Sequence, residues 1–122
     1  MQPLKSHGRF PYSAITRRPD YHWPGKKRLA VYLGFNLEHF EFGSGLGAAL
    51  GPKSPEPDVL NYSWRDYGVR TGIWRMMDVM EKHGVKATVE LNSDVCRHYA
   101  RIIEGGKQLG WEWMGHGNNN ST

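Results

Sequence analysis

Large apolar residues occupy every second position from Leu29 to Leu37, and smaller or polar residues stand between them. This two-residue period predicts a β-strand that begins near residue 27 and is covered on both faces. Residues 1–26 show no such period and are rich in proline, glycine, tyrosine and arginine, which is typical of irregular structure. We therefore expect an irregular N-terminal arm over 1–26 and a folded domain over 27–122.

A helical period occupies residues 64–84, where apolar side chains recur at spacings of three and four: Val69, Ile73, Met76, Met77 and Met80. Such a stripe is typical of the core-facing side of a helix, and Gly84 predicts where the helix ends. The methionines are interpreted as core residues rather than as part of a cofactor site. Residues 41–63, which contain glycine and proline turn signals, predict a long loop with little secondary structure of its own.

Two more strands and a second helix complete the pattern. VKATVELN at 85–92 predicts a short strand, and WEWMGHG at 111–117 predicts another. Between them, Ser93 or Asp94 can cap a helix that reaches about Leu109 and is weakened by Gly105–Gly106. The order strand, helix, strand, helix, strand requires a parallel sheet, so the predicted fold class is α/β with a parallel βαβαβ arrangement.

Charge and composition narrow the functions to be considered. The net charge is +4, but the 16 lysines and arginines are spread along the chain, which does not indicate a nucleic-acid surface. Cys96 is the only cysteine, so a disulfide framework is excluded and a reducing compartment is favoured. The longest apolar-rich run, 29–37, is too short for a membrane span, and the first residues lack a signal-peptide core. We expect a cytoplasmic protein that binds neither nucleic acid nor membrane, and homo-oligomers stay open.

Polar side chains follow each predicted strand where it ends. They are Asn36, Glu38 and His39 after the first strand, Glu90 and Asn92 after the second, and His116 with Asn118, Asn119 and Asn120 after the third. The carboxyl ends of parallel strands meet at one edge of a sheet, and ligands bind there. Glu38 falls on the small-residue face of its strand, the face that would line a barrel. His39 joins it only if the chain leaves the strand at that point.

A family resemblance is carried by three segments: NLEHF, SWRDYGVRTGIWRMMDVMEKHGVKATVELNS and GWEWMGHGNNN. Together they resemble the first half of a polysaccharide deacetylase (NodB-homology) domain, and within that superfamily the allantoinase-like branch. The likeness extends over about residues 8–122. It implies a deformed (β/α) barrel of roughly twice this length, of which 27–122 would be the N-terminal half and this chain an incomplete fragment.

The resemblance also implies roles for individual residues. In metal-dependent members the first motif supplies a general base and one metal ligand, and a later motif supplies two histidine ligands. The match puts Glu38 at the base, His39 at the first ligand position and His116 at the first histidine, while Asn120 replaces the second histidine. Allantoinase-like members are implied to work without the usual metal set. Because an asparagine is a poor zinc ligand, we expect no cofactor; a divalent metal such as Zn²⁺, if bound, would use His39 and His116.

The function implied by the resemblance is hydrolysis of a C–N bond other than a peptide bond, in a small ureide or an N-acetylated sugar. Glu38 is the predicted general base, and His116 is predicted to polarise the carbonyl or stabilise the oxyanion. The predicted substrate-binding residues are His39, Arg70, Asn92 and Asn120. Because half a barrel would carry half a site, we expect the isolated chain to have little or no activity.

The alternative is a catalytically inactive carbohydrate-binding or interaction module derived from the same fold. It is supported by the aromatic side chains near the helix start and the third strand, which are Trp64, Trp111 and Trp113. The missing second half of the barrel supports it as well.

Overall fold

The computed structural model describes residues 7–45 and 47–121, which divide into two compact units between Val31 and Tyr32. In the first unit the described residues form two short 3-10 turns, Ile15–Arg17 (η1) and Pro24–Lys26 (η2), and an isolated bridge joins Trp23 to Lys27. The boundary expected from the sequence lay at residue 26. No helix among the described residues is long and apolar enough to cross a membrane.

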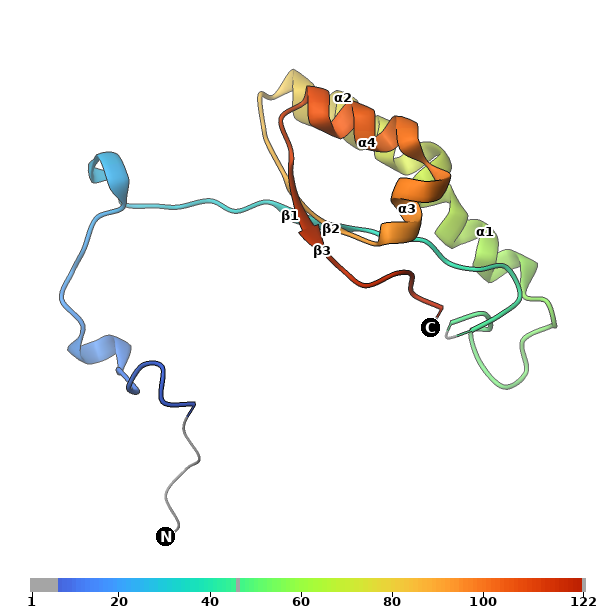
Figure 1. Cartoon of the computed structure of the whole chain (residues 1–122), viewed down its shortest axis with the longest axis horizontal. Coiled ribbons are helices and arrows are strands. Elements are labelled where there is room, and N and C mark those ends of the chain that lie inside the picture. The colour runs from blue at the N-terminus through green and yellow to red at the C-terminus, as the bar shows by residue number, and fades with distance from the viewer. Residues whose placement is uncertain (1–6, 46, 122) are drawn as a thin grey trace, which may run out of the picture. The chain divides into compact units, whose positions relative to one another are not determined.

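The second unit is built on a parallel sheet in the order β1-β2-β3, with strands Gly34–Leu37 (β1), Thr88–Leu91 (β2) and Glu112–Gly115 (β3) (Figure 1). Gly34 pairs with Thr88, and Thr88 with Glu112, so the strands run in register from one end to the other. The predicted α/β class and the parallel order of the three strands are therefore confirmed.

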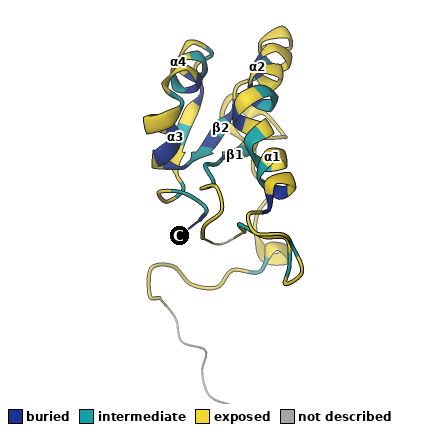
Figure 2. Cartoon of the chain, turned by 90° about the vertical axis from the view of Figure 1, so that its right-hand side faces the viewer, coloured by how far each residue is buried: buried dark blue, intermediate teal, exposed yellow. Residues whose placement is uncertain are grey.

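Two helical crossovers connect the strands. The first consists of Val59–Tyr67 (α1), a π-helical turn Gly68–Gly72 (η3) and Ile73–Lys82 (α2); the second consists of Ser93–His98 (α3) and Ala100–Gln108 (α4). α2 and α4 contact each other above the sheet. The burial colours in Figure 2 show that the helices turn their buried sides inwards, toward each other and the strands. The core residues are Leu37, Val69, Ile73, Met77, Ala87, Val89, Val95, Ile102 and Trp111.

The helices cover one face of the sheet, and the other face is polar. Phe35, Leu37 and Val89 belong to or pack against the core, whereas the alternate positions Asn36 and Glu112 are exposed. The prediction of a first strand covered on both faces is therefore wrong. It is also shorter than its apolar pattern: β1 begins at Gly34, the Leu33 carbonyl oxygen still accepts a hydrogen bond from the Thr88 N–H at 2.9 Å, and Leu29 is 76% exposed.

The helix boundaries differ from the pattern in two places. α1 begins at Val59, within the expected loop, because the Asp58 carboxylate accepts a hydrogen bond from the Asn61 N–H at 3.0 Å and caps the helix. This bond lowers the pKa of Asp58 below its ordinary value. The second crossover breaks at Tyr99, which has φ −133° and ψ 49°, rather than at Gly105–Gly106.

Gly106 lies inside α4 because the helix approaches the sheet closely there. A β-carbon at this position would lie 2.5 Å from the Trp113 side chain and 2.8 Å from that of Trp111. Both distances are shorter than van der Waals contact, so only glycine lets α4 seat against the two indole rings. The glycine that weakens the helix by propensity is thus required by packing.

Gly106→Ala is expected to destabilise the chain by about 1–3 kcal/mol, because the added methyl group overpacks the contact with Trp111 and Trp113. The measurement is the free energy of unfolding from urea titration. Gly68→Ala is the matched control: Gly68 has a helical φ of −55° and no atom within 4 Å of an added β-carbon. The free energy of unfolding of Gly68→Ala should equal that of the parent chain or be slightly higher. Equal losses in both variants would contradict the close approach at Gly106.

Candidate functional site

The Asn92 side chain ties together the carboxyl ends of the three strands. Asn92 follows β2 and is fully buried. Its Oδ1 accepts a hydrogen bond from the His39 N–H at 3.0 Å, and its Nδ2 donates to the His116 carbonyl oxygen. One amide therefore satisfies backbone groups in the segments that follow β1 and β3, and it holds those segments beside each other.

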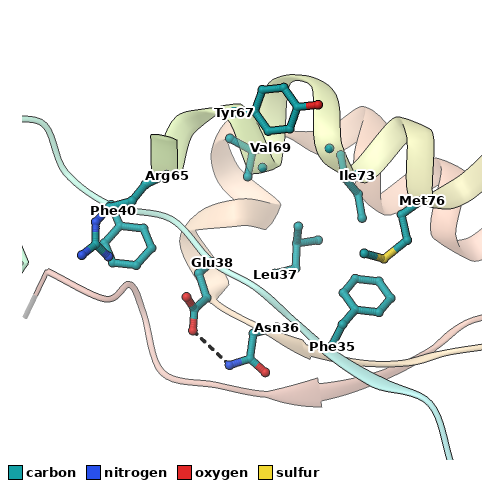
Figure 3. Close-up of a pocket in the computed structure, with 12 residues that line it drawn as sticks. Phe35, Asn36, Leu37, Glu38, Phe40, Arg65, Tyr67, Val69, Ile73 and Met76 are labelled. Carbon is teal, nitrogen blue, oxygen red and sulfur yellow. Dashed lines mark hydrogen bonds between the residues drawn. The ribbon is translucent and has the colours of Figure 1, made fainter. Parts of the chain in front are cut away.

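Glu38 and His116 lie in direct contact at this edge. His116 Nε2 is 3.2 Å from Glu38 Oε1, and the side chains are 35% and 23% exposed. The Asn36 amide donates to the same Glu38 oxygen at 3.1 Å, as Figure 3 shows. On the other side of the imidazole, His116 Nδ1 is 4.0 Å from Glu90 Oε2. The site thus contains a histidine between two carboxylates, all reachable by water.

The segment after β3 is fastened to the start of α3. The backbone N–H groups of Ser93 and Asp94 donate to the carbonyl oxygens of Gly117 and Asn118, each at 3.0 Å. The Asn120 N–H donates to the His39 carbonyl oxygen, also at 3.0 Å. These bonds fix the chain on both sides of His116, so the imidazole is presented by an ordered turn.

A buried carboxylate extends this anchoring. Asp94 accepts a hydrogen bond from Asn119 Nδ2 at 2.8 Å and one from Arg97 at 3.3 Å. The Asn119 bond, followed by the Arg97 contacts, lowers the pKa of Asp94 below its ordinary value. Asn119 Nδ2 also lies 3.3 Å from Glu41 Oε1, which brings the segment after β1 into the same network.

His39 belongs to a different group of side chains. Its Nδ1 lies 3.2 Å from the Tyr99 hydroxyl, and its ring lies 4.9 Å from the His98 ring, centroid to centroid. Burial of the Tyr99 hydroxyl raises its pKa above the ordinary value of 10.0. His39 therefore faces α3 and Tyr99, whereas His116 faces Glu38.

The two predicted metal ligands therefore have different side-chain partners, Tyr99 for His39 and Glu38 for His116. Within the described residues, no group of three or more histidine, cysteine, aspartate or glutamate side chains is arranged to hold a metal ion. Asn120 contributes a backbone donor to His39. The residues at this edge do not supply the three-ligand set of a zinc site.

The arginine near the site differs from the one predicted. Arg70 is 72% exposed and pairs with Asp66 one helical turn earlier, and this contact raises the pKa of Arg70. Arg65 instead packs over the Phe40 ring at 4.2 Å, and its Nε donates to Asn61 Oδ1 at 3.1 Å. The sequence analysis did not identify Arg65. The four-residue spacing of Asp66 and Arg70 could have indicated that Arg70 pairs within its own helix.

A cavity of about 470 Å³ opens beside β1 and reaches Glu38 (Figure 3). Its walls come from β1, α1, η3 and the start of α2. The lining residues are Phe35, Asn36, Leu37, Glu38, Phe40, Arg65, Tyr67, Gly68, Val69, Gly72, Ile73 and Met76. The candidate base therefore stands at the rim of a space large enough for a small molecule.

Most of the predicted site residues lie at the edge of the sheet where the strands end. They form three separate sets of contacts there. Glu38 contacts His116, Asn92 bridges the backbones of His39 and His116, and Asn120 supports His39. Arg70 contacts Asp66 and none of these. Comparison of the chain with protein-family models, with curated proteins and with solved structures finds no match.

Acid is expected to destabilise the anchored segment. The pKa of Asp94 in the folded chain lies below the ordinary value of 3.8, so ionised Asp94 stabilises the fold above that pH. This contribution is lost as the pH falls through the folded-state pKa. The urea midpoint, measured from about pH 6 to about pH 2, should therefore drop less in Asp94→Asn than in the parent chain. The pKa of Asp58 is also lowered in the folded chain, so the Asp94→Asn variant should keep part of the acid-induced drop in urea midpoint. Identical pH curves for the parent chain and Asp94→Asn would contradict the role of Asp94.

The expectation of no tightly bound transition metal can be checked by elemental analysis. The chain should be purified without chelator and its zinc content measured against protein concentration. We expect well below one equivalent, because His39 and His116 have separate partners. A full equivalent of zinc that is lost in both His39→Ala and His116→Ala would show that the two rings do share a metal.

Proposed function

We propose that this chain carries the general base and the carbonyl-polarising residue of a hydrolase for C–N bonds other than peptide bonds. The observation that supports it most is the 3.2 Å contact between Glu38 and His116 at the carboxyl ends of parallel strands. A carboxylate and an imidazole at this distance, at the rim of a cavity, are a common arrangement for attack on a carbonyl by water.

Glu38 is the residue that activates water in this proposal. Its Oε1 is oriented by Asn36 and His116, which leaves Oε2 to accept a proton from a water molecule. As the water oxygen bonds to the carbonyl carbon, its proton passes to Glu38. When the C–N bond breaks, Glu38 returns this proton to the departing nitrogen. An N-acetyl group yields acetate and an amine, a cyclic ureide opens to one molecule that carries both the acid and the freed nitrogen, and the Glu38 carboxylate is regenerated.

His116 stabilises the negative charge that develops on the carbonyl oxygen. One ring nitrogen bonds to Glu38, and the other faces Glu90 at 4.0 Å, too long for a direct hydrogen bond. In this step the imidazole carries a proton on both ring nitrogens, and a substrate oxygen that approaches Nδ1 accepts a hydrogen bond from it. Because the carbonyl of His116 is held by Asn92, the imidazole needs little reorganisation to do so.

The remaining features of the proposal come from the resemblance to the NodB-homology superfamily. The three parallel strands would be part of a deformed (β/α) barrel, and the substrate would be a small ureide or an N-acetylated sugar in the cytoplasm. Of the predicted substrate-binding residues, Asn92 acts as a positioning residue, since its amide is occupied by His39 and His116.

The inactive-module alternative loses much of its support from burial. Trp111 is 5% exposed and packs edge-on against Phe35 in the core, and Trp113 is partly buried beside it. Of the three tryptophans, only Trp64 has a mostly exposed side chain, at 60%. A carbohydrate-binding surface would need these rings on the outside.

Glu38→Gln is expected to lower hydrolysis by about 10²–10⁴-fold, because it removes the base and keeps the shape of the side chain. The measurements are ring opening of allantoin to its carboxylic acid and acetate release from an N-acetylglucosamine oligomer, at high protein concentration, since we expect the parent rate itself to be low. His116→Asn should lower the rate by about 10²–10³-fold.

Glu112→Gln is the matched control. Glu112 lies on the polar face of the same sheet and bonds to Thr88 at 3.1 Å, away from the strand ends. Its rate should equal that of the parent chain. Turnover by the parent chain that persists in Glu38→Gln counts against the proposal.

A further inference from the structure

The cavity beside β1 has two chemically different ends. Figure 3 shows Phe35, Ile73 and Met76 at one end, and Glu38 with Arg65 and Phe40 at the other. Leu37 and Val69 form the floor between them and belong to the core. A molecule that fills this space would therefore bury an apolar group at one end and place polar groups at the other.

Arg65 brings a positive charge to the polar end. Its guanidinium rests on the Phe40 ring, and its Nε is occupied by Asn61, whose own amide donates to the Gly47 carbonyl oxygen at 2.7 Å. The side chain is thus held in place from two sides. Within the described part of the chain, Arg65 forms no ion pair with a carboxylate. Its terminal nitrogens lie beside Gly47, and an anionic ligand at this end of the cavity would be a partner for their charge.

We infer that this cavity binds a small N-acyl compound that carries both a carboxylate and an apolar side chain, such as an N-acylated apolar amino acid. Arg65 holds the carboxylate, the walls of Phe35, Ile73 and Met76 hold the apolar side chain, and the acyl carbonyl lies toward Glu38. The charge and the apolar lining select this class together. The identity of the bond that is cut rests on the proposed function, whereas the binding preference does not.

The lining opposes a sugar as the occupant of this cavity. A sugar ring presents hydroxyl groups on every side, and each hydroxyl buried against Phe35, Leu37 or Ile73 would lose its hydrogen bond to water. A neutral ureide would leave the Arg65 charge without a partner. The inference therefore replaces both substrate classes that the resemblance implies by a third one for the same site. An N-acyl amino acid satisfies both requirements with one carboxylate and one hydrocarbon side chain.

The test compares two ligands of the same shape. N-acetyl-L-phenylalanine carries a carboxylate, and N-acetyl-L-phenylalanine amide replaces it by a neutral group. Their dissociation constants are measured on the full chain by chemical-shift titration. We expect the carboxylate to bind about 10–100-fold more tightly, as charge-assisted bonds to arginine do. N-acetylglycine, which lacks the apolar side chain, should bind about tenfold or more weakly than N-acetyl-L-phenylalanine.

Variants then assign the preference to Arg65. Arg65→Gln should bring the two dissociation constants close together, whereas a purely structural role would weaken both ligands equally. Arg101→Gln, an equal charge change at an exposed position of α4, should leave the ratio unchanged. Arg65→Lys keeps the charge and should keep part of the preference, and it carries the test if Arg65→Gln fails to fold by circular dichroism.

The outcomes separate this inference from the proposed function. Equal binding of the two ligands to the parent chain, no saturable binding, or a ratio unaffected by Arg65→Gln would overturn the inference. Tighter binding of N-acetylglucosamine than of N-acetyl-L-phenylalanine would also overturn it. Arg65-dependent binding that survives in Glu38→Gln supports it, and it does so even where no hydrolysis is measured and the proposed function fails.

Discussion

The buried amide of Asn92 is the contact on which the site depends. It lies after the central strand and bonds to the backbones that leave the two outer strands, through the His39 N–H and the His116 carbonyl oxygen. A buried amide without these partners would cost about 1–3 kcal/mol for each lost bond, so the segments cannot separate cheaply. Asn92 holds His116 directly, and it holds His39, which follows Glu38 in the chain. The 3.2 Å contact of Glu38 with His116 follows from these two bonds.

A second constraint is that the helices cover one face of the sheet. Burying Val89, Leu37 and their neighbours beneath α2 and α4 turns the alternate residues of the same strands outwards. Polar and charged side chains can occupy that outer face without a desolvation cost. Glu38, Glu90 and His116 continue it at the strand ends, where they remain partly exposed and open to a small ligand.

Helix geometry decides which arginine serves the cavity. Asp66 and Arg70 stand one turn apart on the outside of the first crossover and satisfy each other. Asn61 and Arg65 have the same spacing, but Asn61 is buried and its bond draws the Arg65 stem across Phe40. Arg70 is neutralised by Asp66 of the same helix, whereas Arg65, which has no such carboxylate partner among the described residues, lines the cavity. Recognition of a carboxylate there and chemistry at Glu38 would share one rim.

The local patterns of the sequence determined the class of fold. Alternating and helical periods predicted the three strands and the two crossovers, and the polar residues after each strand placed Glu38 and His116 at one edge before any contact was known. These features could be predicted because periodicity depends on which side of an element is buried, and parallel strands must end together. This rule predicted that Glu38 and His116 share an edge, whereas their 3.2 Å contact depends on the bonds of Asn92.

Only the tertiary structure decided the features that depend on partners distant in sequence. The apolar run that begins at Leu29 joins the sheet only from Leu33, the ring of His39 turns to Tyr99, and Gly106 is required by two tryptophans that follow it. Arg65 is a candidate ligand-binding residue because Phe40 and Asn61 hold it beside the cavity in the folded chain. A sequence pattern states which faces of each element are buried, but hydrogen bonds and charges are satisfied by neighbours in space, and those neighbours exist only once the elements have packed.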